Sequence, residues 1–95
     1  MDSFKDKYAV VSGAGAGIGM ALATQLVSEG CNVAICDIDQ ARLDAALANL
    51  TDSKPDRVEV FGFCCDASDE AQVASFAAAL QSHFEISHLN LLVNN

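Results

Sequence analysis

Basic residues are scarce in this chain, which has 5 lysines and arginines against 13 aspartates and glutamates and a formal net charge of −8. Nucleic acids and anionic membranes are bound through clustered Lys and Arg, so both are disfavoured as partners. Long apolar runs are also missing: none approaches the ~20 residues of a membrane span, and the N-terminal stretch MDSFKDKYAVV contains no apolar signal region. These absences predict a cytoplasmic protein.

Paired metal-binding cysteines are absent as well. The chain has four cysteines, none of them in a C-x-x-C arrangement, which disfavours a zinc site and thioredoxin-type redox chemistry. Cys36 and Cys64 fall in apolar strand-like runs, where a thiol behaves as a small hydrophobe, so we expect both to be buried. Reduced, structural thiols fit a cytosolic location.

Proline occurs once, at Pro55, in the polar stretch 51–57, which predicts a surface loop. On either side of it, β-rich runs alternate with helical patterns. The expected strands are 7–12, 32–36, 58–65 and 89–95, and the expected helices are 17–30, 40–50 and 68–84. The predicted apolar faces of the three helices are Ile18, Ala21, Leu22, Leu26 and Val27; Leu43, Ala46, Leu47 and Leu50; and Val73, Phe76, Ala77, Leu80 and Phe84.

This alternation predicts an α/β fold with a parallel sheet, right-handed crossovers and helices on both faces. The arrangement expected is a Rossmann-type, doubly wound sheet of four strands in the order 3-2-1-4. The length of 95 residues accommodates one small domain, covering 1–95 and ending after the fourth strand. Such a sheet has a binding crevice beyond the carboxyl ends of its first and fourth strands.

The most informative stretch is GAGAGIG at residues 13–19, which leaves a predicted strand and opens a predicted helix. The dinucleotide pattern G-x-G-x-x-G fails in both possible registers, because Ile18 and Met20 stand where a glycine is needed. A Walker phosphate loop fails too, since no Gly-Lys-Ser/Thr follows.

Two glycine patterns remain. G-x-x-x-G-x-G is met by Gly13, Gly17 and Gly19, which would allow a tight turn, a close approach of pyrophosphate to the helix start, and close packing of helix on sheet. G-x-G-x-G, typical of S-adenosylmethionine-dependent methyltransferases, is met by Gly13, Gly15 and Gly17. It usually follows an acidic residue, where this chain has Val11, and it gives no reason for Gly19.

Asp37 lies 18 residues after Gly19, at the end of the second predicted strand. This spacing is close to the ~20 residues expected for an acid that binds the adenosine ribose of NAD. NADP-binding sites usually carry Arg or Lys in this region, whereas Ala16 and Ile38 supply no charge and Arg42 lies a helical turn further on. NAD is therefore predicted, and NADP is the weaker expectation; the alternative role for Asp37 is to cap the next helix, for which Asp39 is better placed.

Polar residues also follow the third and fourth predicted strands. Asp66 and the neighbouring Ala67 could contact adenine, although Asp66 could instead cap a helix in competition with Ser68 and Asp69. Asn94 leaves the last strand beside the glycine turn, where its amide could touch the nicotinamide ribose or brace the loop. His83 and His88 flank the entry to that strand, away from the crevice, and are expected to have surface roles.

Together, SGAGAGIG, the Asp ending NVAICD, CCDAS and LLVNN resemble the N-terminal half of a short-chain dehydrogenase/reductase. The resemblance runs from about residue 5 to residue 95, with Ser12 in place of the family's usual Thr. It implies pyrophosphate binding by residues 13–19, with Ala16, Gly17 and Ile18 at the cofactor. It further implies ribose binding by Asp37, adenine contacts from Asp66 and Ala67, and Asn94 near the cofactor's ribose.

The family's catalytic groups are an Asn, a Ser and a Tyr-x-x-x-Lys pair on later segments, and the 95 residues do not contain them. The only tyrosine, Tyr8, is followed four positions later by Ser12. The resemblance implies a hydride-transfer oxidoreductase acting on a small carbonyl or alcohol. The dimer-forming helices of the family also come later, so a homo-oligomer is an expectation for a longer form. The chain by itself is expected to be inactive; the alternatives are a non-catalytic nucleotide-binding module and half of a methyltransferase.

Overall fold

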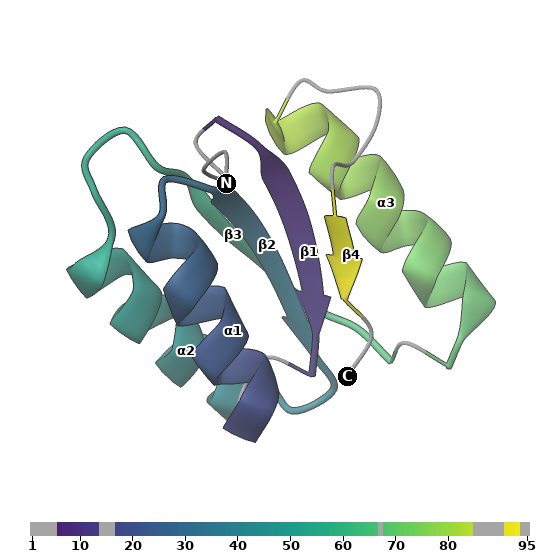
Figure 1. Ribbon diagram of the computed structural model, residues 1–95. Coiled ribbons are helices and arrows are strands. Elements are labelled where there is room, and N and C mark those ends of the chain that lie inside the picture. Colours follow the sequence, from purple (N-terminus) through teal and green to yellow (C-terminus); the bar gives the residue numbers. More distant parts are fainter. Residues whose placement is uncertain (1–5, 14–16, 67, 85–90, 94–95) are drawn as a thin grey trace.

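The computed structural model describes residues 6–13, 17–66, 68–84 and 91–93. The elements alternate as β1 (Tyr8–Ser12), α1 (Gly17–Ser28), β2 (Asn32–Asp37), α2 (Gln40–Ser53), β3 (Val60–Cys64), α3 (Glu70–Phe84) and β4 (Leu91–Val93). All paired strands are parallel, and the sheet order is β3-β2-β1-β4 (Figure 1). The predicted α/β class, strand order and doubly wound arrangement are confirmed.

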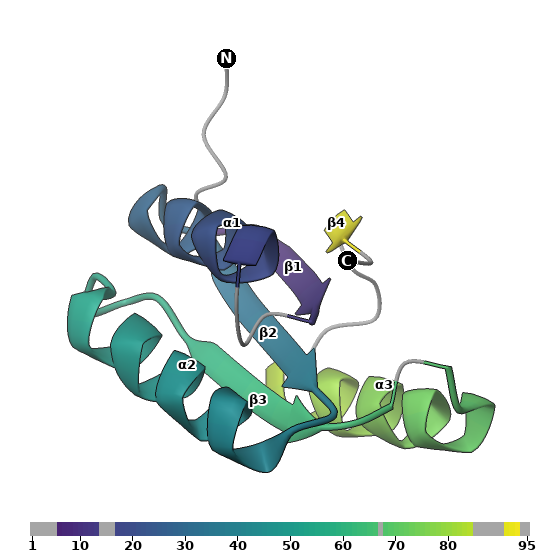
Figure 2. The ribbon, with the colours of Figure 1, turned by 90° about the horizontal axis from the view of Figure 1, so that it is seen from below.

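The sheet separates α1 and α2 on one face from α3 on the other (Figure 2). Successive residues of a strand point to opposite faces, and β1 follows this rule: Ala9 and Val11 pack with α1 and α2, whereas Val10 packs on the α3 side. The central strand β2 is buried along its whole length, as expected for a strand covered on both faces.

The larger core lies between the sheet and helices α1 and α2. Its fully buried side chains include Leu26, Ile35, Leu50 and Val58. The predicted apolar face of α2 is confirmed, with Leu47 only partly buried. The core on the α3 side is smaller and includes Phe76 and Leu80 together with the thiol side chains of Cys36 and Cys65.

Helix α2 is longer than predicted, because residues 51–53 belong to it and not to the loop. Its end is set by Pro55, which disfavours helical backbone at the preceding residue. Lys54 accordingly adopts an extended conformation (φ −73°, ψ 150°), while its N–H still donates to the carbonyl of Leu50.

Five predicted core positions are wrong. Ile18 is 78% exposed and Ala21 is exposed, so α1 faces the core with Gly19, Ala23, Leu26 and Val27. In α3, Val73 is 40% exposed and Ala77 is also exposed, because only the Phe76 and Leu80 side of this helix meets the sheet. Cys64, predicted to be buried, is exposed at the end of β3, the strand at one edge of the sheet.

Candidate functional site

The carboxyl ends of the parallel strands meet at one edge of the sheet, and α1 begins at that edge (Figure 1). In the sheet, β2 lies on one side of β1 and β4 lies on its other side, so the strand order reverses at β1. Such a reversal of strand order is where doubly wound sheets bind their ligands. The predicted site residues Gly13, Gly17, Asp37 and Asp66 all lie at or just beyond these strand ends.

Two of the predicted phosphate-loop glycines have backbone conformations that other residues rarely adopt. Gly13 (φ 65°) continues the pairing with β2, because its N–H donates to the carbonyl of Cys36 at 2.9 Å. Gly17 (φ 62°) is exposed at the first position of α1, and a Cβ built there would meet nothing within 4 Å. Among the described residues, nothing therefore fills the space in front of Gly17, while Gly19 is buried against the core as predicted. Ala16 lies outside the described residues.

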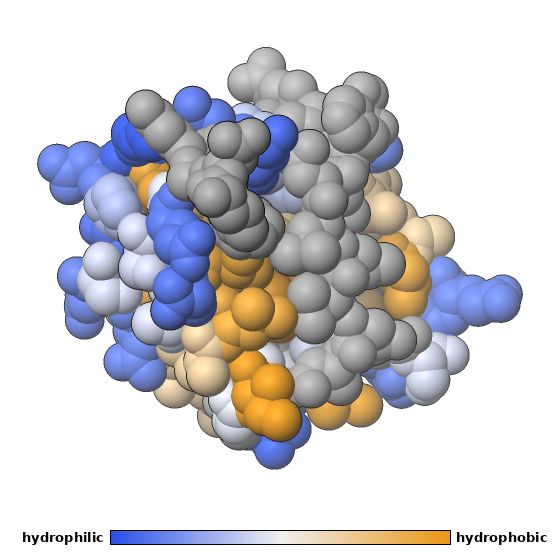
Figure 3. Space-filling view, viewed as in Figure 1, coloured by the Kyte–Doolittle hydropathy of each residue, from blue (hydrophilic) through white to orange (hydrophobic). Residues whose placement is uncertain are grey.

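The first turn of α1 suits an anion. It contains no acidic residue, so none of its own side chains offsets the partial positive charge of the helix N-terminus. Ile18 extends from the same turn into solvent. In the space-filling view, apolar surface reaches the end of the molecule at which α1 begins (Figure 3).

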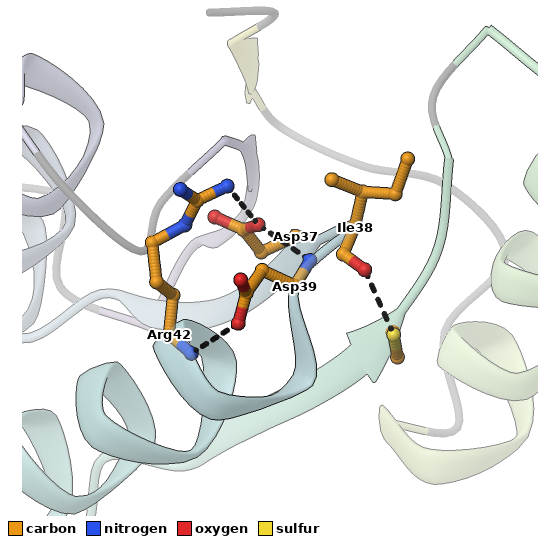
Figure 4. Close-up of polar contacts among 5 residues, drawn as sticks. Asp37, Ile38, Asp39 and Arg42 are labelled. Carbon is orange, nitrogen blue, oxygen red and sulfur yellow. Dashed lines mark hydrogen bonds and ion pairs between the residues drawn. The ribbon is translucent and has the colours of Figure 1, made fainter.

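Asp37, the last residue of β2, has a side chain only 5% exposed. Its Oδ1 accepts hydrogen bonds from the N–H of Asp39 at 2.8 Å and from Nη2 of Arg42 at 3.2 Å (Figure 4). The hydrogen bond and charge of Asp37 raise the pKa of Arg42 above its ordinary value. Asp39, not Asp37, caps α2, because its Oδ1 accepts from the N–H of Arg42 at 3.0 Å. The capping alternative for Asp37 is therefore wrong, and its carboxylate is held at the strand end.

Arg42 was not predicted to belong to this site. In the sequence it stands five positions after Asp37, which suggested a separate place on α2. In the structure its guanidinium extends back over the turn between β2 and α2 to the carboxylate (Figure 4). The only signal in the sequence was a lone cation in the first turn of a helix, a position that the helix dipole disfavours.

Ile38 follows Asp37 and is 63% exposed. Its side chain points away from the Asp37–Arg42 pair, and its carbonyl accepts from the thiol of Cys64 at 3.5 Å (Figure 4). Ile18 and Ile38 are the two most exposed large hydrophobic side chains in the described part of the chain, and both were predicted at the cofactor. Exposed apolar side chains beside buried charge are typical of a surface that a ligand covers.

Asp66 follows β3 and stabilises the turn before α3. Its Oδ1 accepts from both the hydroxyl and the N–H of Ser68, and these two hydrogen bonds lower the pKa of Asp66. It does not cap α3, since the carboxylate of Asp69 accepts from the N–H groups of Ala71 and Gln72. Asp66 therefore lies at the predicted edge as an ordered acid, while Ala67 and Asn94 fall outside the described residues.

The histidines and the tyrosine contribute no described group to this edge. His83 is exposed and stacks on Phe61 with 4.4 Å between ring centroids, which agrees with a surface role. His88 lies outside the described residues. Tyr8 begins β1, at the opposite end of the strand, and packs on the α3 side. Among the described residues no cluster of His, Cys, Asp or Glu could hold a metal ion, and no helix is long and apolar enough to cross a membrane.

The described part of the site thus has a buried acid at the end of β2 and, at the start of α1, a first turn without acidic side chains. The model of one protein family, described as short chain dehydrogenase, matches residues 7–95. The chain belongs to the short-chain dehydrogenase family. This membership supports the pattern met by Gly13, Gly17 and Gly19 over the methyltransferase pattern.

Relatives in this family are dehydrogenases and reductases. The chain is 35% identical to levodione reductase from Leifsonia aquatica over 81 residues, which are 85% of this chain and 30% of the relative. It is 35% identical to D-threitol dehydrogenase from Mycolicibacterium smegmatis over 89 residues, 94% of this chain and 32% of the relative. The chain thus spans about a third of the length of these relatives.

Solved structures of the family have the same backbone arrangement. A short-chain dehydrogenase from Burkholderia phymatum in complex with NAD has a TM-score of 0.85 and 34% identity, over 97% of this chain and 31% of the other. L-Sorbose reductase from Gluconobacter frateurii, complexed with NADPH and L-sorbose, has a TM-score of 0.88 and 28% identity, over 100% of this chain and 35% of the other.

Proposed function

We propose that this protein is the cofactor-binding half of an NAD-dependent oxidoreductase that moves a hydride between nicotinamide and a small carbonyl or alcohol. The observation that carries the proposal is the carboxylate of Asp37, ordered at the carboxyl end of β2 at the sheet edge where Gly17 opens α1. When bound, the cofactor supplies the hydride acceptor or donor. The residues of this chain bind it and orient it.

Each part of the cofactor is assigned a proposed binding position. The N–H groups and dipole of α1 receive the pyrophosphate, which can approach closely because Gly17 has no side chain. The carboxylate of Asp37 accepts hydrogen bonds from the ribose hydroxyls, and Ile18 and Ile38 cover apolar faces of the cofactor. Asp66 and Ala67 at adenine, Ala16 at the pyrophosphate and Asn94 at the nicotinamide ribose complete the proposed set.

The preference for NAD rests on Asp37 and not on the backbone. The structural relatives include one solved with NAD and one solved with NADPH, so this arrangement of strands and helices accepts either cofactor. A buried carboxylate at the ribose repels the 2′-phosphate of NADP, whereas it accepts a hydrogen bond from the 2′-hydroxyl of NAD. NAD is therefore the proposed cofactor.

Proton transfer is assigned to none of the 95 residues. The family's catalytic Ser and Tyr-x-x-x-Lys pair have no counterpart among them, and Tyr8 lies at the wrong end of β1. We therefore propose that residues 1–95 form a single cofactor-binding domain that is inactive without further segments. All four cysteines are free thiols, which supports the proposed cytoplasmic location.

The test is a calorimetric titration of the full-length protein with NADH. Asp37→Ala should weaken binding by about ten- to a hundredfold, since hydrogen bonds to a charged group contribute about 1.5–3 kcal/mol. The matched control is Asp52→Ala, which makes the same charge change at an exposed position near the other end of α2. If Asp37→Ala binds NADH with unchanged affinity, Asp37 does not belong to the cofactor site. Absence of saturable NADH binding to the wild-type protein would refute the proposed function.

A further inference from the structure

Strand β3 forms one edge of the sheet (Figure 1). Its hydrogen bonds to β2 use every second residue: the N–H of Cys65 donates to the carbonyl of Asp37, and the carbonyl of Glu59 accepts from the N–H of Val33. The N–H and C=O groups of the alternate residues therefore point away from β2. These outward residues are Val60, Gly62 and Cys64.

The outer edge of β3 carries none of the usual protection against strand pairing. Natural sheets guard their edges with lysine, proline, a β-bulge or a covering element. The strand VFGFC has no charged residue and no proline, and its register with β2 runs without a bulge. In the described part of the chain, no hydrogen bond reaches the outward groups of β3. Doubly wound sheets add their later strands beyond the fourth strand, so β3 stays at the edge.

The edge of β3 is complementary to itself in the antiparallel direction. Two copies that present the same edge to each other across a two-fold axis have antiparallel edge strands. With the axis at Gly62, every outward N–H faces an outward C=O, because Gly62 lies opposite Gly62 of the second copy and Val60 lies opposite its Cys64. This register uses all the outward groups of both strands.

Other registers fit less well. Moving the axis by one residue in either direction places an outward residue opposite one whose N–H is already bonded within the chain. Cys64 would then lie opposite Val58, or Val60 would lie opposite Asp66. The backbone alone therefore favours the axis at Gly62.

The side chains agree with this register. Phe61 and Phe63 lie on the α3 side of the sheet, where they stack on His83 and Phe76. In the antiparallel pair, Phe61 lies opposite Phe63 of the second copy at a non-hydrogen-bonded position, where cross-strand side chains are closest. Aromatic pairs are favourable in such positions. On the α2 side, Gly62 places no side chain at the axis.

The charges that flank β3 also favour the antiparallel direction. Both basic residues near the strand, Lys54 and Arg57, precede it, whereas the charged residues that follow it are all acidic: Asp66, Asp69 and Glu70. Antiparallel pairing brings the start of one strand beside the end of the other. The acidic ends of the two copies are thereby kept apart, and each lies near basic side chains.

We propose that the outer edge of β3 is an interaction surface for a second copy of this protein, which joins the two sheets across a two-fold axis at Gly62. This inference goes beyond the proposed function and does not depend on cofactor binding. It concerns an edge strand and not the later helices from which a homo-oligomer was expected.

The first test is amide hydrogen exchange of the full-length wild-type protein, followed by NMR. Two protein concentrations are compared, one on each side of the monomer–dimer midpoint found by sedimentation velocity. The amides of Val60, Gly62 and Cys64 should exchange about tenfold more slowly, or more, at the higher concentration. Those of Phe61 and Phe63 are internal controls, because they point toward β2 and are protected at both concentrations.

The second test is a pair of substitutions at Cys64. Cys64→Pro removes an outward N–H that the monomer does not use, so the dissociation constant of the dimer should rise about tenfold or more. The matched control is Cys64→Ser, which keeps the N–H and should change this constant less than about threefold. Circular dichroism of both variants checks that the fold is retained, and the exchange experiment needs no variant.

Several results would overturn the inference. One is a protein that stays monomeric at its highest soluble concentration; another is a dimer whose outward amides exchange as fast as those of the monomer. Protection that does not depend on concentration would mean that a later segment of the chain covers the edge. Equal dissociation constants for Cys64→Pro and Cys64→Ser would also contradict the pairing. A monomeric protein that binds NADH leaves the proposed function intact, so the two proposals fail separately.

Discussion

Gly62, in the middle of β3, is the position where the packing of α2 on the sheet can be tested most directly. A Cβ built at Gly62 would lie 2.8 Å from Cγ and 3.0 Å from Cδ2 of Leu47, with Cδ1 closer still. Side-chain carbons do not approach this closely, so Gly62→Ala forces Leu47 or the whole helix to move. The clash involves one side chain on one helix, which makes the prediction specific.

Two opposing effects set the size of the change. Replacing Gly by Ala in a strand stabilises by about 0.5–1 kcal/mol, because the unfolded chain loses conformational freedom. Overpacking a core by one methyl group costs about 1–3 kcal/mol. Leu47 is only partly buried and can yield to some extent, so we expect a net destabilisation of about 1–2 kcal/mol from these two terms.

A double-mutant cycle with Leu47→Ala isolates this contact. With the leucine truncated, Gly62→Ala should become neutral or stabilising, which gives a coupling energy of about 2 kcal/mol. Leu43→Ala is the control background. Leu43 lies on the same helix, but the three atoms nearest to the new Cβ all belong to Leu47. In the Leu43→Ala background, Gly62→Ala should lower the free energy of unfolding by as much as it does in the wild-type protein.

The assay is urea unfolding followed by far-ultraviolet circular dichroism. With a slope of about 2 kcal/mol per molar urea, the predicted loss moves the midpoint by about 0.5–1 M. Equal effects of Gly62→Ala in the wild-type and Leu47→Ala backgrounds would refute the reasoning, and so would a stabilised single variant. Either result would mean that Leu47 does not fill the space in front of Gly62.

Two further predictions concern the thiols. Burial raises the pKa of Cys31 and of Cys36 to about 11 from an ordinary value of 9.0. The folded protein therefore keeps protons that the unfolded chain loses above pH 9. The free energy of unfolding should fall between pH 9 and pH 11, and at pH 10 the loss should be on the order of 1 kcal/mol per thiol. Urea midpoints at pH 8 and pH 10 measure this loss of stability. Cys31→Ala should reduce the loss by the contribution of one thiol. If the loss is unchanged in this variant, the raised pKa of Cys31 is contradicted. Iodoacetamide at pH 8 should alkylate the exposed Cys64 first, while Cys31, Cys36 and Cys65 react only on unfolding. Mass spectrometry of the native protein checks the order, and early labelling of Cys36 would argue against the smaller core.

Element order and type were predictable because each element carries its own local pattern. β-branched runs and helical spacing identified every strand and helix, and the alternation led to the strand order. The end of α2 was missed because the polar residues 51–53 resemble a loop, although the backbone restriction before Pro55 takes effect only at Lys54. Local composition was a weaker guide there than stereochemistry.

Burial was less predictable than helicity. Helical spacing shows which residues share a face, but it does not show how much of that face another element covers. Ile18 and Val73 lie on apolar stripes and yet are exposed, because α1 and α3 meet the sheet along narrower contacts than their sequences suggest. Cys64 is exposed for a related reason, since it ends an edge strand.

By itself, the sequence determined the alternating fold, the glycine spacing that opens α1 and the acid at the end of β2, because each depends on neighbouring residues or on a short, regular spacing. Only the tertiary structure decided that Arg42 forms an ion pair with Asp37 and that Gly62 faces Leu47. Both contacts join different elements, and their formation depends on the angle at which a helix packs on the sheet. That angle results from the packing of the whole core, which no single stretch of sequence specifies.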